Sequence, residues 1–387
     1  MTRAAYPISV VRRRPVFDVS TYTPRVIEEV QKAGRRRELY KKLVLLLISC
    51  AVGFLLIETG YRLFDPYPHY PRWEINRTEH GNLSEFDESL GWKGTPSARE
   101  RFVTHNAEVL LRHNRLGFRD VEPDERSASS PALIFLGDSF TWGYEVEFDE
   151  MFVSKIRERL PEYEVFNLAH RGYGTDQALL TLRRWHDERP VERVVLMFSE
   201  NDPDENNSDY QYSKHKPKFD VVEGQLQLTG VPVPRGNQWR TAAAHEDPKS
   251  LVDVLANLVY QSHFLHDLRF RSRRAAQRAE PPTVDAEDMD LTRWILRALR
   301  DEVAGRGARL ALVAIPSKLE FMSIDGYVPY QVQLRPICSE LDIDYLDLAP
   351  FFERRRLRTY FRGGMHWNAR GHTVAAEAIL EFLNDGD

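Results

Sequence analysis

From residue 131 onward, short runs of apolar residues alternate with segments of helical periodicity. The apolar runs lie at 132–136, 164–168, 193–198 and 310–315, with a weaker run at 343–347. Uninterrupted runs of this length are typical of strands buried on both faces. The helical segments lie at 150–160, 176–187, 286–306, 330–341 and 369–384. This alternation predicts an α/β domain over 131–387, with a parallel sheet covered on both sides.

One apolar run is much longer than the others. Residues 43–61 contain a single charge, and a helix of that length rises about 28 Å, close to the thickness of the bilayer core. Residues 1–42, directly before it, hold eleven Lys or Arg against four Asp or Glu, a net charge of +7. Because basic flanks stay in the cytoplasm, the pattern predicts a cytoplasmic tail over 1–42 and a single transmembrane helix over 43–61. The remainder is then extracytoplasmic, periplasmic in a bacterium. A buried core helix is the alternative.

Composition narrows the classes of function. The whole chain of 387 residues has a net charge of -5, so the part after residue 42 carries -12, which argues against a general nucleic-acid binder. The two cysteines, Cys50 and Cys338, cannot form a disulfide scaffold or a four-thiolate zinc site. A mean hydropathy of -0.48 excludes a protein with many membrane spans. We expect neither a metal nor another cofactor.

Two regions depart from the alternating pattern. Residues 62–130 are rich in Pro, Gly, Tyr and charge, which predicts short strands and turns in an extracytoplasmic linker or accessory segment. Residues 203–284 interrupt the α/β pattern and are interpreted as an insertion. Within it, 221–228 has the pattern of a small hairpin, and 253–274 that of one amphipathic helix.

Four polar or glycine-containing segments follow the predicted elements in order. Ser139, in Gly-Asp-Ser-Phe, comes directly after the first strand, where open α/β sheets place their sites. Gly172 follows the second strand, and a glycine lets a backbone N–H approach a ligand closely. Asn201 follows the third, and its amide can donate to an oxyanion. His366 precedes the last helix, and a neutral histidine can take a proton from a serine.

With these four blocks in this order, the sequence resembles the SGNH (GDSL-type) hydrolase family. The resemblance spans 139–366; it does not cover 1–130, and covers the insertion only loosely. It implies a three-layer α/β/α sandwich in which a serine attacks an ester carbonyl. Carried over, Ser139 is the nucleophile and His366 the base. The Ser139 N–H, the Gly172 N–H and the Asn201 side chain form the oxyanion hole.

The sequence departs from the family at the third member of the triad. The resemblance places the acid two or three residues before the histidine, where this chain has Gly364 and Gly363. Loss of that acid costs about 10⁴ in rate in a serine protease. Three alternatives remain: a Ser–His dyad oriented by a main-chain carbonyl, another acid, for which Asp347 is the named candidate, or a pseudoenzyme.

Several other residues have structural interpretations. Asp138 and Asp202 are expected to accept hydrogen bonds from loop amides rather than to bind a metal. His372 is expected to pack on the last helix, and Trp367 either to line the site or to pack beneath that helix.

The hypothesis is a membrane-anchored serine esterase or O-acyltransferase acting on O-acyl, above all O-acetyl, groups. The anchor, the outward domain and the segment 315–318 resemble proteins that modify cell-surface polysaccharides, which is analogy rather than chemistry. The expected partners are therefore an acylated carbohydrate and the membrane, with no nucleic acid. The alternative is a catalytically inactive carbohydrate-binding or assembly protein with the same fold.

Overall fold

The computed structural model describes residues 24–64, 83–104, 106–122, 130–186, 189–236, 250–277, 286–322, 324 and 326–385. The chain divides into two compact units, Met1–Leu63 and Phe64–Asp387.

The first unit is built around one helix, α1 (Pro24–Phe64), which contains the predicted span 43–61. Within it, Gln31–Phe64 is long and apolar enough to cross a membrane, as judged by length and composition. Its large apolar side chains are exposed, among them Leu45, Leu46 and Leu56. The helix starts well before the apolar run, because the basic residues ahead of that run are good helix formers.

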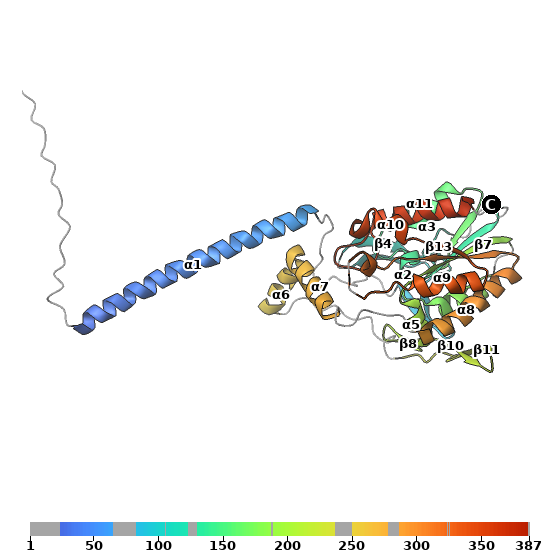
Figure 1. The fold of residues 1–387 in the computed structure, drawn as a ribbon, viewed down its shortest axis with the longest axis horizontal. Helices are drawn as coiled ribbons and strands as arrows, with labels where there is room; N and C mark the ends of the chain where they lie inside the picture. The colour runs from blue at the N-terminus through green and yellow to red at the C-terminus, as the bar shows by residue number, and fades with distance from the viewer. Residues whose placement is uncertain are drawn as a thin grey trace, which may run out of the picture. The chain divides into compact units, whose positions relative to one another are not determined.

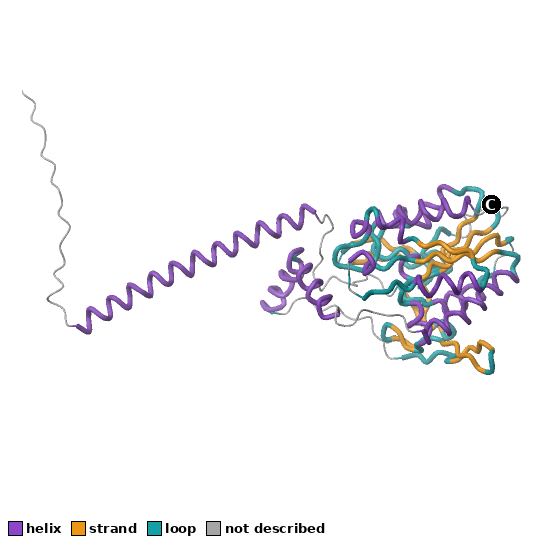
Figure 2. Tube along the Cα trace, in the orientation of Figure 1, coloured by secondary structure: helices purple, strands orange, loops and turns teal. Residues whose placement is uncertain are grey.

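The second unit contains the predicted parallel sheet, and its five strands match the five apolar runs. In spatial order they are β13 (Asp344–Asp347), β12 (Arg309–Ala314), β7 (Val191–Phe198), β5 (Ala132–Leu136) and β6 (Glu164–Asn167). All neighbouring pairs are parallel. The strands that carry the serine and asparagine blocks, β5 and β7, are therefore adjacent, with β6 beside β5. Figure 2 shows the strands of the sheet in orange and the helices in purple.

Helices cover both faces of the sheet, which gives the predicted three-layer α/β/α architecture (Figure 1). Alternate residues of β5 enter different cores: Ile134 packs in one cluster and Phe135 in the other, and both are fully buried. The first cluster includes the following helices: α4 (Thr175–Arg184), α8 (Ala286–Gly305) and α9 (Gln331–Glu340). The second includes α3 (Phe152–Arg159), α10 (Ala349–Glu353) and α11 (Ala369–Asp385).

The described part of the accessory segment forms two antiparallel hairpins of short strands, as predicted. Their strands are β1 (Ser84–Asp87) with β2 (Gly91–Gly94), and β3 (Arg99–Val103) with β4 (Glu108–Arg112). The second hairpin has its own apolar cluster, in which Phe102 and Leu111 pack against Trp142, Ala169 and Phe361. Those three residues come from the loops that carry the serine, the glycine and the histidine. The hairpin therefore fixes the three loops relative to one another.

The insertion begins with α5 (Asp202–Asn207) and continues through two hairpins and two helices. The predicted hairpin is β10 (Lys218–Val222) with β11 (Gln225–Thr229), preceded by the short pair β8 (Tyr210–Gln211) and β9 (Lys214–His215). The prediction of one helix over 253–274 was wrong. Two helices are present, α6 (Leu251–Gln261) and α7 (His263–Gln277). Ser262 separates them, because its extended backbone and its hydroxyl, which accepts from Leu265 N at 3.2 Å, cap the start of α7.

The remaining short helices lie near the site: α2 (Ser139–Trp142), η3 (Phe148–Glu150), η5 (Lys318–Met322) and η6 (Arg356–Thr359).

Candidate active site

Ser139 is the first residue of α2, one turn of helix that starts three residues after the last residue of β5. The Asp138 carboxylate caps this turn by accepting from Phe140 N at 2.8 Å. Gly143, at φ 83°, ends the turn in the left-handed conformation. The serine is thus held at the carboxyl edge of the sheet by a cap at each end of a very short helix.

His366 reaches Ser139 across 227 positions of sequence. Its Nε2 lies 2.8 Å from Ser139 Oγ, a hydrogen bond between the two side chains. The imidazole packs beside two aromatic rings, with centroids 5.0 Å from Phe140 and 4.5 Å from Tyr144. It remains 26 % exposed, so a ligand can reach it.

The loop that carries His366 is held from below by a buried lysine. Lys318 Nζ donates to three main-chain carbonyls of that loop, Phe361 O at 2.6 Å, Arg362 O at 2.9 Å and Gly364 O at 2.7 Å. Charged donors to carbonyls are among the stronger hydrogen bonds in proteins. The lysine of the 315–318 segment therefore positions the histidine loop.

Burial sets the protonation state of the histidine. It lowers the pKa of His366 from 6.5 to about 4, because a low-dielectric environment disfavours the imidazolium. At neutral pH the ring is uncharged, and Nε2 can act as the acceptor of the Ser139 proton.

A carboxylate faces the other ring nitrogen, and it belongs to Glu145. Glu145 Oε2 lies 3.9 Å from His366 Nδ1, and this buried oxygen has no hydrogen-bond partner among the described residues. The second oxygen, Oε1, accepts from Asn106 Nδ2 at 3.0 Å. Burial raises the pKa of Glu145, while hydrogen bonds from Thr104 and Asn106 and the charge of Lys318 act to lower it. At 3.9 Å the two groups are within ion-pair distance but do not form a hydrogen bond.

Glu145 occupies the space that the missing acid would have filled. A Cβ placed on Gly364 would lie 3.6 Å from Glu145 Oε2, and one on Gly363 would lie 2.0 Å from His266 Cε1 of α7. The structure does not bring Asp347 to this point. Its Oδ1 accepts from Ala349 N at 2.9 Å, and its Oδ2 lies 3.3 Å from Arg335 Nη2.

The two backbone donors named for the oxyanion hole are available. In the described part of the chain, the N–H groups of Ser139 and Gly172 donate to no acceptor. Gly172 has φ 73°, and a Cβ there would lie 2.7 Å from the Tyr212 ring, so both the backbone and the space require a glycine. Its loop is fixed by Trp92, whose indole N–H donates to Arg171 O at 3.2 Å.

Asn201 belongs to a polar network centred on Ser199, which reaches Asp138, the residue before Ser139. The Ser199 hydroxyl contacts Asp138 Oδ2 at 2.9 Å, Asn201 Oδ1 at 2.8 Å and Asp202 Oδ2 at 3.1 Å. A hydroxyl has one proton, so Ser199 cannot donate to all three oxygens at once. Burial raises the pKa of Asp138 to about 7 and that of Asp202 well above its usual value.

The structural interpretations of the other residues are confirmed. Asp202 accepts from Ser199 N at 2.7 Å, and Asp138 accepts from Phe140 N, so both bind loop amides. His372 is buried, with Nδ1 accepting from Phe152 N at 3.3 Å. Trp367 is fully buried and packs against Phe140 with centroids 4.9 Å apart, so it lies beneath the site.

Sequence reasoning missed Glu145, although a signal was present. It is the single charged residue between Phe140 and Val146, a stretch that is otherwise aromatic, small or apolar. A charge in such a context is either unfavourably buried or has a specific partner. Gly143, which ends α2, is the feature that turns the chain back toward the serine.

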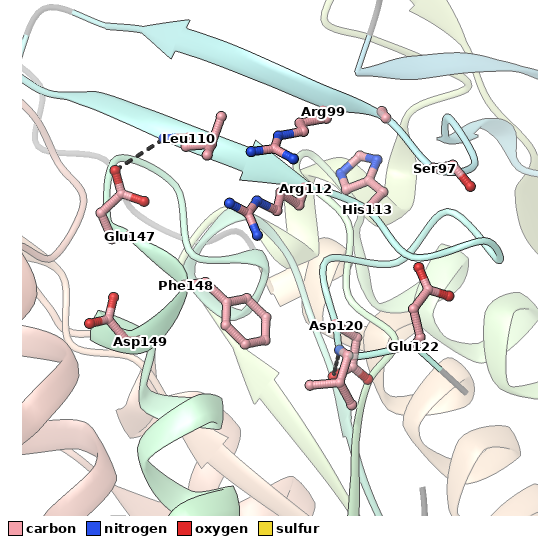
Figure 3. Close-up of a pocket in the computed structure, with 12 residues that line it drawn as sticks. Ser97, Arg99, Leu110, Arg112, His113, Asp120, Glu122, Glu147, Phe148 and Asp149 are labelled. Carbon is pink, nitrogen blue, oxygen red and sulfur yellow. Dashed lines mark hydrogen bonds between the residues drawn. The ribbon is translucent and has the colours of Figure 1, made fainter. Parts of the chain in front are cut away.

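A cavity of about 540 Å³ lies away from this site, between the β3–β4 hairpin and η3 (Figure 3). Arg99 and Arg112, directly opposite each other on the two strands, project into it. Glu147 and Asp149 face them from η3 and the residue before it, and Glu147 Oε1 accepts from Leu110 N at 3.1 Å. Neither Ser139 nor His366 lines this cavity, and its charges are mixed.

Comparison with known proteins places this geometry in a family. No curated protein matches the chain. Two solved structures are similar at 15% identity and a TM-score of 0.35. One is a lipolytic protein of the G-D-S-L family from Veillonella parvula, matched over 65% of this chain and 97% of that one. The other is an acetyl xylan esterase from Geobacillus stearothermophilus, matched over 66% and 96%. The model of the GDSL-like lipase/acylhydrolase family matches residues 135–374, well over half of the sequence, and the chain belongs to that family.

Proposed function

We propose that this protein is a serine esterase or O-acyltransferase in which Ser139 is the nucleophile and His366 the general base. The observation that carries the proposal is the 2.8 Å contact between Ser139 Oγ and His366 Nε2, with the Glu145 carboxylate behind Nδ1. A nucleophile, a neutral base and an acid that orients the base make up the arrangement required for acyl transfer.

The first half of the reaction acylates the serine. Ser139 Oγ attacks the ester carbonyl carbon while its proton passes to His366 Nε2. The carbonyl oxygen becomes an oxyanion, which accepts from the N–H groups of Ser139 and Gly172 and from the Asn201 amide. Glu145 holds the tautomer with hydrogen on Nδ1 and stabilises the imidazolium. When the tetrahedral intermediate collapses, the C–O bond to the alcohol breaks, and the alcohol leaves with the proton from Nε2.

The second half depends on the acceptor. His366 removes a proton from water or from a sugar hydroxyl, and that oxygen attacks the acyl-serine carbonyl carbon. The bond to Ser139 Oγ then breaks, and Oγ recovers its proton from Nε2. Water yields a free acid and makes the protein an esterase. A sugar hydroxyl yields a new ester and makes it an O-acyltransferase.

The proposed substrate is an O-acetylated polysaccharide of the cell surface, and the proposed location is the outer side of the cytoplasmic membrane. The apolar helix within α1 and the basic residues before it support a single-pass anchor. The name of one structural neighbour, an acetyl xylan esterase, agrees with an acetylated carbohydrate. The alternative is an inactive binding or assembly protein. The absence of an acid at the family position favours it, and the Glu145 carboxylate 3.9 Å from His366 Nδ1 is the observation against it.

The test is active-site labelling of the full chain in detergent with a fluorophosphonate probe, which reacts with an activated serine. We expect labelling at Ser139, its loss in Ser139→Ala, and hydrolysis of a small aryl acetate by the unaltered protein alone. A mutation of the neighbouring surface, Arg112→Met, serves as the control that keeps full labelling. Equal aryl acetate turnover in the unaltered protein and in His366→Ala, with no labelled serine, would leave the binding protein as the function.

A further inference from the structure

A cation stands beside the proposed active site and takes no part in the steps above. It is the guanidinium of Arg171, the residue directly before Gly172. Its central carbon lies 5.5 Å from the ring centroid of Phe102 and 5.5 Å from that of Trp142. Trp142 is the last residue of α2, the helix that begins with Ser139. The cation is therefore held by the same short element that holds the nucleophile.

The charge of Arg171 is not neutralised by the protein. Within the described ranges, the guanidinium pairs with no carboxylate and no hydrogen-bond acceptor, and burial lowers its pKa. The side chain is half-buried, so part of its hydration is lost. Contacts with aromatic faces recover some of that loss, but they do not satisfy five N–H donors.

A second arginine nearby, Arg119, has a structural role and serves as a comparison for Arg171. Arg119 is fully buried, and it donates to the main-chain carbonyls of Trp142, Gly143 and Val146. Its donors are used to hold the loop that leads to Glu145. Arg171 makes no such bonds, although the same loop lies next to it.

Among the described residues, Lys214 is a second cation on which the charge of Arg171 acts. Lys214 of β9 lies with Nζ 5.1 Å from the ring centroid of Trp92, and Trp92 donates to the Arg171 carbonyl. Burial lowers the pKa of Lys214 to about 8, and repulsion from Arg171 acts in the same direction. The charge of Lys214 therefore acts on the same region as that of Arg171.

Tyr144 connects this cation to the catalytic pair. Its ring centroid lies 4.5 Å from that of His366 and 5.6 Å from that of Phe102, the ring that the Arg171 guanidinium contacts. A group bound by Arg171 would therefore sit near an ester at Ser139, beside the N–H of Gly172.

From this geometry we infer that Arg171 binds an anionic group on the alcohol part of the substrate. The inference rests on the proposed function, and it narrows the substrate class to O-acylated acidic saccharides. The charge belongs on the alcohol because an acetyl group carries none. A guanidinium binds carboxylates and phosphates through the same paired hydrogen bonds, so the anion is a uronate carboxylate or a phosphate substituent.

A matched pair of small esters tests the inference: 3-acetoxybenzoate and its uncharged methyl ester. Each kcat/KM is divided by the rate of hydroxide hydrolysis of the same ester, which removes differences in intrinsic reactivity. We expect the unaltered full-length protein to favour the carboxylate at least tenfold. Arg171→Met should bring that ratio to about one, because methionine keeps the contact with the rings and removes the charge. The same change at Arg112, an exposed arginine of β4, should leave the ratio unchanged.

Binding of the corresponding alcohols separates this inference from the proposed chemistry. Calorimetry with 3-hydroxybenzoate, 3-hydroxyphenyl phosphate and methyl 3-hydroxybenzoate requires no turnover. At least tenfold tighter binding of one anion, lost in Arg171→Met, supports the inference and shows whether the anion is a carboxylate or a phosphate. Equal affinity for all three compounds overturns it, whether or not any ester is hydrolysed. Absence of turnover together with selective anion binding overturns only the proposed chemistry.

Discussion

At the scale of single residues, the least expected feature is the conformation of Glu145. Its backbone has φ 69°, in the left-handed region that costs a residue with a side chain about 1 kcal/mol or more. Gly143, two residues earlier, is also left-handed. The two residues turn the chain sharply after α2, and the turn directs the carboxylate at His366. Strain of this kind persists where the surrounding structure enforces it, here through Asn106 and the main-chain bonds of Arg119.

Replacing Glu145 tests whether its charge supports the histidine. Glu145→Gln keeps the shape, but it removes the charge that stabilises the imidazolium and presents an N–H where the ring needs an acceptor. We expect kcat for an aryl acetate to fall by about 10³–10⁴, with a thermal midpoint within a few degrees of the unaltered protein. A kcat reduced less than tenfold would show that the carboxylate is dispensable.

Moving the carboxylate back to the family position is the matching rescue. Gly364 does not have a positive φ, and a Cβ there would meet the flexible end of Asn106 at 2.8 Å. In a Glu145→Ala background, adding Gly364→Asp should therefore raise kcat at least tenfold above that of Glu145→Ala alone. Gly363→Asp should not, because its Cβ would collide with the imidazole of His266. Equal kcat values for the Gly363→Asp and Gly364→Asp variants would show that the position of the carboxylate does not matter.

The sequence was sufficient for the serine and histidine to be paired but not for their acid to be identified. Ser139 follows from its position after the first strand of the sheet, and its pairing with His366 follows from the resemblance to the family. Glu145 depends on two left-handed residues after a four-residue helix, and on Asn106 from a distant hairpin. Neither the backbone conformation nor the contact leaves a periodic pattern in the sequence.

At the scale of elements, the site depends on packing contacts between three loops and the β3–β4 hairpin. The β3–β4 hairpin supplies Phe102, which packs with Trp142 and Phe361, and the adjoining turn supplies Asn106 to Glu145. The segment expected to be a linker or accessory therefore contributes directly to the geometry of the catalytic loops. Regular strands and helices were predictable from periodicity, whereas this packing depends on side chains far apart in the sequence.

Lys318 shows how one element controls another. It lies at the start of η5 and binds three carbonyls of the histidine loop. Lys318→Met would leave those carbonyls without their donor, at a cost of about 2–4 kcal/mol in the free energy of unfolding. We expect kcat to fall at least tenfold as the loop loses its restraint. Denaturant titration and aryl acetate kinetics on the full chain measure both, with Lys155→Met on α3 as the control. Unchanged values for both would contradict the role.

At the scale of the whole molecule, the chain combines two compact units of opposite charge. Residues 1–42 carry +7 and the rest of the chain -12. Length, apolar composition and the basic flank were all readable from the sequence, because a membrane imposes its requirements on composition rather than on contacts. The α/β alternation was readable for a similar reason, since each face of the sheet needs its own apolar set.

The proposed topology makes a prediction about the charges rather than about the apolar run. Lys and Arg near a span determine which end stays in the cytoplasm, and Arg35, Arg36, Arg37, Lys41 and Lys42 lie just before it. In spheroplasts, added protease should digest residues 64–387 of the unaltered protein. In a separate experiment, the undigested protein should stay in the membrane during extraction with alkaline carbonate. Changing the five basic residues to Glu should increase the protected fraction of 64–387, because the tail then loses its cytoplasmic preference. Substituting Arg3, Arg12, Arg13 and Arg14, further from the span, should have a smaller effect.

Complete protection of 64–387 in the unaltered protein would reverse the topology. Release by carbonate would instead make α1 a helix that does not span the membrane.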